Sequence, residues 1–216
     1  MVTIALFCAL AYVVMFVFRV NVSFLTFDVK DAVITICGLI FGPIAALISA
    51  FTVAFLELIT VSDTGVYGFL MNFISSAAFS CTAALVYKYK RKMSGAAIGL
   101  LAAVFSTTAT MLVFNIIITP LFMKVDRAIV FQMIPTLLLP FNATKAVFNA
   151  ALVLFFYKPV STALKAAKVI KTPEATNNNN KNSIWQTVIT CAIGLSLIAA
   201  SVLVFVFVLD GQISWF

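Results

Sequence analysis

Five polar side chains interrupt apolar stretches of the sequence, and their types indicate recognition of a small molecule. They are Glu57, Asn72, Asn115, Asn142 and Lys145. A carboxylate accepts hydrogen bonds, an ammonium donates them, and an Asn amide does both side by side. If these groups share one cavity among the 22 Phe residues of the chain, that cavity suits a flat, apolar heteroaromatic compound with adjacent ring N–H and carbonyl groups.

Other kinds of chemistry lack the residues that they need. The chain has no His, which removes imidazole metal ligands and His-activated nucleophiles. The four Cys residues lie singly in apolar segments without a CxxC spacing, so we expect buried hydrophobes rather than metal ligands or disulfide partners. They are Cys8, Cys37, Cys81 and Cys191. We therefore predict no enzyme activity, no metal site and no resident cofactor.

The composition excludes an ordinary soluble protein. Of the 216 residues, 63% are hydrophobic and 10% are charged, against roughly 45–50% and 25% in a typical soluble domain. The mean hydropathy is +1.15. The apolar segments are continuous and do not alternate in polarity, which favours membrane-spanning helices over a β-barrel. The sequence therefore predicts an all-α integral membrane protein.

The apolar segments predict six helices that position the polar side chains. They cover residues 2–18, 32–41, 44–61, 67–87, 95–118 and 141–157. The first segment lacks a basic leading region and a cleavage motif, so we expect a retained helix rather than a signal peptide. We expect Pro120 to end the fifth helix and residues 121–140 to form a connector with a short interfacial segment.

The excess of positive charge predicts how the chain crosses the membrane. The net charge of +7 comes from 14 Lys and Arg against 7 Asp and Glu, and loops rich in Lys and Arg stay on the cytoplasmic side. The basic stretches 88–92 and 158–171 therefore predict a cytoplasmic N-terminus. Residues 19–31, 62–67 and 121–140 then form the external loops. We attribute the charge to orientation and predict no nucleic-acid partner.

On this topology the five polar side chains lie at a similar depth, near the outer surface. Asn142 and Lys145 are three residues apart on one helix face, and Asn149 continues the same stripe. This arrangement predicts a solute pocket that opens to the outside. In the alternative interpretation, Glu57 and Lys145 only pair with each other, and the Asn side chains only bridge helices.

The C-terminal part of the chain has a different composition. We predict a membrane domain over residues 1–160, followed by a polar cytoplasmic linker at 161–186 that contains a run of Asn. Residues 187–209 predict one further transmembrane helix, flanked by Trp185 and Trp215 as interfacial anchors.

Four segments, in order along the chain, carry a resemblance to a known family. They are FLTFDVKDAVITICGLIFGPIAALIS, ELITVSDTGVYGFLMNFISSAAFS, FNIIITPL and PFNATKAVFNAAL. Together they resemble the riboflavin-specific S component of energy-coupling factor (ECF) vitamin transporters, over about residues 1–160. The resemblance implies a six-helix bundle, and the predicted C-terminal helix is an addition to that pattern.

The resemblance also implies a function and partners. An S component captures riboflavin with high affinity from outside a bacterial cell membrane, with flavin mononucleotide (FMN) as a plausible second ligand. It works with a transmembrane T component and two cytoplasmic ATPases, and this chain has no GxxxxGK[ST] phosphate loop of its own. The T component binds a small-residue face of the first helix, which Ala5 and Ala9 match. Their spacing alone also fits internal packing.

Ligand contacts follow residue by residue from the matched motifs. Asn115, Asn142 and Lys145 match positions that hydrogen-bond the isoalloxazine ring. We predict Glu57 and Asn72 as candidates for contact with the ribityl hydroxyls or for pocket structure.

The loop after the first helix matches a lid that closes over the ligand, and it includes Phe24, Asp28 and Asp31. Because a fold does not dictate its ligand, an S component for thiamin, biotin or pantothenate is an alternative. A membrane assembly protein without a small ligand is another.

Overall fold

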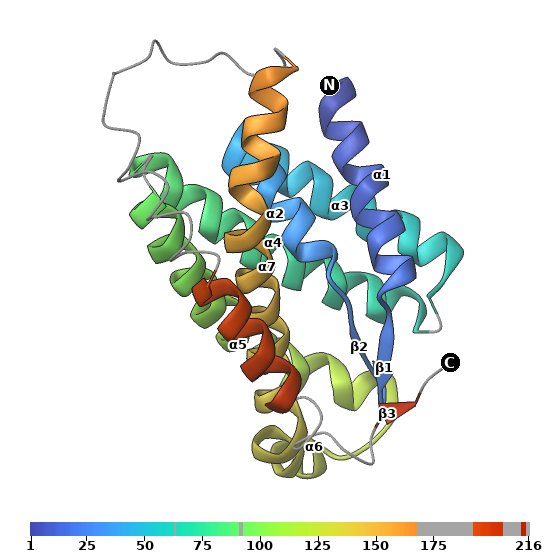
Figure 1. Ribbon diagram of the computed structural model, residues 1–216. Coiled ribbons are helices and arrows are strands. Elements are labelled where there is room, and N and C mark those ends of the chain that lie inside the picture. The colour runs from blue at the N-terminus through green and yellow to red at the C-terminus, as the bar shows by residue number, and fades with distance from the viewer. Residues whose placement is uncertain (63, 91–92, 168–191, 205–212, 215–216) are drawn as a thin grey trace.

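The computed structural model describes residues 1–62, 64–90, 93–167, 192–204 and 213–214. Its elements in chain order are α1 (Val2–Val17), β1 (Val20–Val22), β2 (Leu25–Phe27), α2 (Lys30–Phe41), α3 (Pro43–Thr60), α4 (Gly65–Tyr89), α5 (Met93–Met123), α6 (Arg127–Met133), the π-helical turn η1 (Ile134–Leu138), α7 (Leu139–Ala166), a helix over Ala192–Val204, and β3 (Ile213–Ser214). Figure 1 shows a helical bundle with the N-terminus at one end and the strands at the other, which we call the hairpin end.

Four helical segments of the described chain are long and apolar enough to cross a membrane. They are α3, α4, α5 and the continuous run Arg127–Ala166, which joins α6, η1 and α7. With 16 residues α1 is about 24 Å long, and with 12 residues α2 is about 18 Å long. Both are shorter than the roughly 30 Å apolar core of a bilayer. The chain is mostly helical, but the predicted count of six spanning helices plus a seventh is not confirmed.

The short helix α2 lies at the centre of the bundle. It packs against α1, α3, α4 and α7, and 9 of its 12 residues are buried. At Gly38 the helices approach closely, since a Cβ built there would lie 2.7 Å from Ala46 Cβ on α3 and 3.3 Å from Ala84 Cβ on α4. The missing side chain at Gly38 therefore permits this packing.

Part of the predicted loop at 19–31 forms an antiparallel hairpin. Val20 pairs with Phe27 and Val22 with Leu25, and the turn includes Ser23 at a φ of 55°. Val22 is fully buried and belongs to an apolar cluster with Phe141 at the start of α7. β3 pairs with the other edge of β1, giving the strand order β2-β1-β3. The all-α prediction missed this small sheet because the strands are only three residues long or shorter.

Two predicted interruptions are helical in the structure. Pro120 does not end α5, because a proline near the end of a helix removes only one hydrogen bond. The helix instead ends at Met123, before Lys124 with its left-handed φ of 54°. The predicted connector 121–140 is wrong from Arg127 onward, where α6 and η1 lead directly into α7. The π-helical turn ends at Leu138, and Pro140 follows in the first turn of α7, a position at which a helix tolerates proline.

Helix α7 also continues beyond the predicted end at Tyr157, through Pro159 to Ala166. It therefore includes the first residues of the predicted linker, and residues 168–186 lie outside the described residues.

Of the predicted C-terminal helix 187–209, the structure describes Ala192–Val204 as helical. Gly194 and Ser201 are its buried residues. A Cβ built at Gly194 would lie 3.3 Å from the carbonyl oxygen of Ala151, so this helix packs on α7.

We expect Gly38→Val to destabilise the bundle, because a branched side chain would force α2 away from α3 and α4. The loss should be about 1–3 kcal/mol and should lower the midpoint of thermal unfolding in detergent. The control is Leu101→Val at a side chain that is 63% exposed on α5, where the effect should stay within about 0.5 kcal/mol. Equal midpoints for the two variants would contradict the packing role of Gly38.

Candidate functional site

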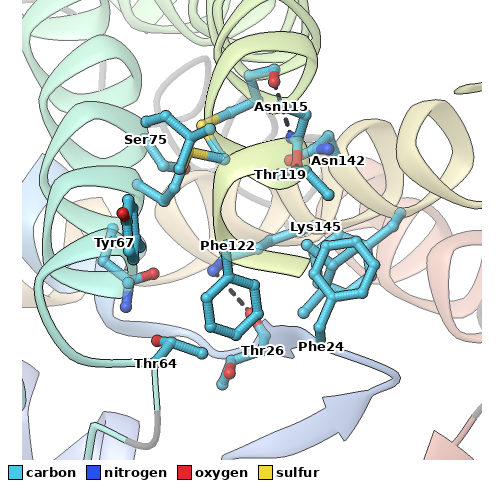
Figure 2. A pocket seen from close by; sticks show the side chains of 17 residues that line it. Phe24, Thr26, Thr64, Tyr67, Ser75, Asn115, Thr119, Phe122, Asn142 and Lys145 are labelled. Atoms are coloured by element: carbon cyan, nitrogen blue, oxygen red, sulfur yellow. Dashed lines mark hydrogen bonds between the residues drawn. The ribbon is translucent and has the colours of Figure 1, made fainter. Parts of the chain in front are cut away.

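A cavity of about 80 Å³ lies at the hairpin end (Figure 2). The hairpin, α4, α5 and α7 enclose it, so distant parts of the chain meet there. Its lining residues are Phe24, Leu25, Thr26, Thr64, Tyr67, Gly68, Met71, Asn72, Ser75, Met111, Asn115, Ile118, Thr119, Phe122, Phe141, Asn142 and Lys145. Aromatic rings and amides thus surround one cation.

Three asparagines of this lining have hydrogen-bonding capacity left for a ligand. Asn115 and Asn142 each donate from Nδ2 to the carbonyl oxygen four residues earlier, at 2.7 Å. Thr119 donates to Asn115 Oδ1 at 3.0 Å. Within the described part of the chain, Asn142 Oδ1 accepts no hydrogen bond and the Asn72 side chain makes none. These amides can still donate to or accept from a molecule in the cavity.

Lys145 connects the cavity to the hairpin. Its Nζ donates to the carbonyl oxygen of Thr26 in β2 at 3.0 Å, the contact drawn as a dashed line in Figure 2. It also donates to Asp28 Oδ2 at 2.8 Å. An ammonium has three N–H donors, so one remains for a ligand.

Lys145 also belongs to a group of four charged side chains that we call the buried charge cluster: Asp28, Lys30, Glu57 and Lys145. Asp28 Oδ2 lies 3.4 Å from Lys30 Nζ, and Lys30 Nζ lies 2.5 Å from Glu57 Oε2. The Lys30 backbone N–H donates to Asp28 Oδ1 at 3.3 Å. All four side chains are buried. Each of these four charges therefore has an opposite charge beside it, which is the condition for placing charges in an apolar interior.

The predicted alternative of a direct pair between Glu57 and Lys145 is wrong. Glu57 pairs with Lys30, and Lys145 pairs with Asp28. The reason is that α2 begins at Lys30, so residues assigned to an external loop lie inside the bundle. Asp31 is also buried there and accepts a hydrogen bond from Ser76 on α4.

A second cavity of about 200 Å³ adjoins the first, and Glu57 and Arg19 contribute to its lining. Six residues line both cavities: Phe24, Leu25, Thr26, Thr64, Asn72 and Phe122. Each cavity is smaller than the roughly 300–1,000 Å³ of typical ligand pockets. A ligand with a fused ring system therefore requires that the hairpin or Phe122 move.

The predicted ligand-binding residues fall into three groups according to which cavity they line. Five of them line the first cavity: Phe24, Asn72, Asn115, Asn142 and Lys145. Asp28 lies behind Lys145 and does not line either cavity, and Glu57 lines only the second. Their roles toward a ligand stay predictions.

The aromatic lining residues Tyr67 and Phe122 and the buried residue Lys30 were not predicted from the sequence. Nothing in the sequence spacing distinguishes Phe122, as a lining residue, from the other Phe residues of the chain. For Lys30 there was a signal, because it stands between two acids directly before an apolar run.

The small residues of α1 lie away from the pocket. Ala5 and Ala9 are exposed on the outer surface of the helix, so they do not serve packing among the residues that the structure describes. In contrast, Gly99 on α5 serves helix packing, since a Cβ built there would lie 2.8 Å from the carbonyl oxygen of Ala83 on α4.

Comparisons with known proteins agree on one family. Residues 1–157 match the family model of the ECF transporter substrate-specific component. The chain is 27% identical over 176 residues to the riboflavin transporter RibU of Staphylococcus aureus strain TCH60, covering 76% of this chain and 92% of that protein. The structure of the S component of a bacterial ECF transporter superposes with a TM-score of 0.65 at 26% identity. That match covers 76% of this chain and 96% of the other.

We expect Asp28→Ala to be strongly destabilising, because it leaves the Lys145 ammonium buried without a carboxylate. Breaking a buried pair typically costs about 3–5 kcal/mol, which thermal unfolding in detergent would measure. Asp126→Ala serves as the matched control: its side chain is exposed and, although Asp126 is the N-cap residue of α6, makes no capping hydrogen bond, so the variant should lose about 0.5 kcal/mol, the low end for an N-cap Asp. An Asp28 variant as stable as this control would mean that the cluster does not hold the fold together.

Proposed function

Because the chain belongs to the family of substrate-specific components of ECF transporters, we propose that it is the riboflavin-binding subunit of such a transporter. The family consists of transporter subunits that bind substrate and are not enzymes. The relative RibU is a riboflavin transporter, and the similarity extends over nearly all of its length. Riboflavin as the ligand of this chain rests on that similarity and on the chemistry of the cavity.

The observation that carries the proposal is the set of unused polar groups in the first cavity. The isoalloxazine ring has an edge with a ring N–H between two carbonyl groups. Asn142 Oδ1 can accept from the N–H, and the third donor of Lys145 and Nδ2 of Asn115 can serve the carbonyl oxygens. Tyr67, Phe122 and Phe24 supply aromatic surface for the flat ring.

The adjoining second cavity suits the ribityl chain of riboflavin. Its lining is polar, with Asn72 and Glu57 among residues that can hydrogen-bond hydroxyl groups. Glu57 gives one carboxylate oxygen to Lys30, which leaves the other for a hydroxyl. FMN is the second ligand that we propose for the same site.

We further propose that the pocket faces the outside of a bacterial cell membrane, with the N-terminus in the cytoplasm. The basic stretches 88–92 and 158–171 support this orientation. The hairpin then covers the pocket as a lid, and its outward movement would admit the ligand. A T component and two ATPases would supply the energy for release on the other side.

The binding proposal is tested by titrating the purified protein with riboflavin and following the quenching of flavin fluorescence. We expect the native chain to bind, and Lys145→Ala and Asn142→Ala each to weaken binding by about 1–3 kcal/mol, because each leaves a ligand group unpaired. The matched control is Thr82→Val, which removes a hydrogen bond between α4 and α5 to Ser106 outside the lining of either cavity. A native chain that does not quench riboflavin would rule out the ligand, and unchanged affinity in both pocket variants would rule out the site.

For the partner, we propose that the exposed Ala5 and Ala9 face of α1 binds the T component. Ala5→Leu with Ala9→Leu should abolish co-purification with a co-expressed T component, because bulky side chains prevent close helix approach. Riboflavin affinity should stay unchanged. Ala109→Leu makes the same change at an exposed alanine on α5 and should leave co-purification intact. Complexes of equal yield in all variants would exclude this face.

A further inference from the structure

Asn149 on α7 is buried, and its amide makes three hydrogen bonds although it lines neither cavity. Its Oδ1 accepts the backbone N–H of Ala32 at 2.9 Å. Its Nδ2 donates to the carbonyl oxygen of Asp28 at 3.1 Å and to that of Lys145 at 3.0 Å. One side chain therefore uses both of its N–H donors and one of the two lone pairs of its oxygen, and two of the three bonds reach the segment that leads from β2 into α2.

These contacts hold the backbone at the Asp28 carbonyl and at the first turn of α2 that follows it. The N-cap residue of α2, Val29, offers no side-chain cap, and the Ala32 N–H belongs to the first turn of the helix, where the backbone donors lack regular intrahelical partners. This N–H makes a 3.3 Å contact with the Val29 carbonyl oxygen and a shorter one, 2.9 Å, with Asn149 Oδ1 from another helix. At the same time Asn149 holds the Asp28 carbonyl, so the backbone at Asp28 cannot shift without breaking a buried hydrogen bond.

Asp28 in turn determines where the Lys145 ammonium points. Two of the three N–H donors of Lys145 go to Asp28 and to the carbonyl oxygen of Thr26. Because the three donors of an ammonium have tetrahedral directions, fixing two of them fixes the third. The remaining donor belongs to a residue that lines the first cavity.

We propose that Asn149 is a positioning residue for ligand recognition: by holding the chain at Asp28, it sets the direction in which Lys145 presents its free N–H to the ligand. This inference rests on the proposed riboflavin site. It makes ligand affinity depend on a side chain that the ligand does not touch, through a path that runs from Asn149 to Asp28 and from there to Lys145.

A double-mutant cycle in the full chain tests the path. We expect Asn149→Ala to weaken riboflavin binding about tenfold, as for the loss of one well-placed hydrogen bond. In a Lys145→Ala background the same change should have no further effect, because Asn149 acts only through Lys145. Additive losses, or an Asn149 variant that binds like the native chain while Lys145→Ala is impaired, would overturn the inference and leave the proposed function standing.

The control is Tyr157→Phe, on the same helix and about 12 Å further along it. Its hydroxyl hydrogen-bonds that of Tyr87 on α4 at 2.7 Å, so the variant also loses a contact between α7 and another helix. We expect unchanged riboflavin affinity. If Asn149→Ala does not fold, Asn149→Ser, which keeps a smaller hydrogen-bonding group, takes its place in the cycle with the same expected direction.

A readout without ligand separates this inference from the proposed function. Hydrogen exchange of the Leu25–Phe27 amides should be faster in Asn149→Ala than in the native chain, because the anchor of β2 is lost, and unchanged in Tyr157→Phe. If the native chain bound no riboflavin, the proposed function would be wrong. Hydrogen exchange would then be the measurement that tests whether Asn149 positions the segment at Asp28. Equal exchange in all three proteins would overturn the inference.

Discussion

The structure depends on the ion pairs that Asp28 makes at the junction of β2 and α2. Through Lys145 this carboxylate connects the hairpin to α7, and Lys30 extends the connection to Glu57 on α3. The hairpin, α2, α3 and α7 are therefore joined by one series of buried ion pairs. If any of these charges lacked its partner, the interior would contain an isolated ion, whose cost is several kcal/mol. Because each charge needs its partner, the ion pairs fix the positions of the hairpin, α2, α3 and α7 relative to one another. Apolar packing is non-directional and would fix these positions less closely.

Such a cluster is a poor way to gain stability, since apolar side chains of similar volume often serve as well. Its value lies in directing polar groups. Lys145 lines the cavity while it is held on two sides, and Asn142 and Asn115 lie at the same end with their amides already bonded to their own helices. A preorganised set of donors and acceptors loses little freedom when it binds a rigid ligand. The small cavities at this end indicate that the moving part is the cover and not the polar base of the site.

Helical periodicity and the distribution of Lys and Arg predicted that Asn72, Asn115, Asn142 and Lys145 lie near each other, and all four line one cavity. The ion pairs could not be predicted this way, because the partners of Glu57 and Lys145 come from a segment whose polarity is typical of a loop. Only the short, central α2 brings Asp28 and Lys30 inside. At the prolines, the sequence predicted helix ends that the structure does not have. Pro120 lies within α5, and the segment before Pro140 is a π-helical turn rather than a connector. The local sequence shows where a proline removes a helical hydrogen bond, but tertiary packing decides whether the helix continues through that residue.

The middle strand of the small sheet has neighbours from both ends of the chain. β1 follows α1 after two residues, pairs with β2 on one edge and with Ile213–Ser214 on the other. A strand with both edges occupied offers no open edge to a foreign chain. The pairing with β3 also restrains the hairpin. Any displacement of β1 either moves Ile213–Ser214 with it or breaks the backbone hydrogen bonds between the two strands. The first helix and the C-terminal strand are thereby coupled mechanically, although nearly the whole sequence separates them.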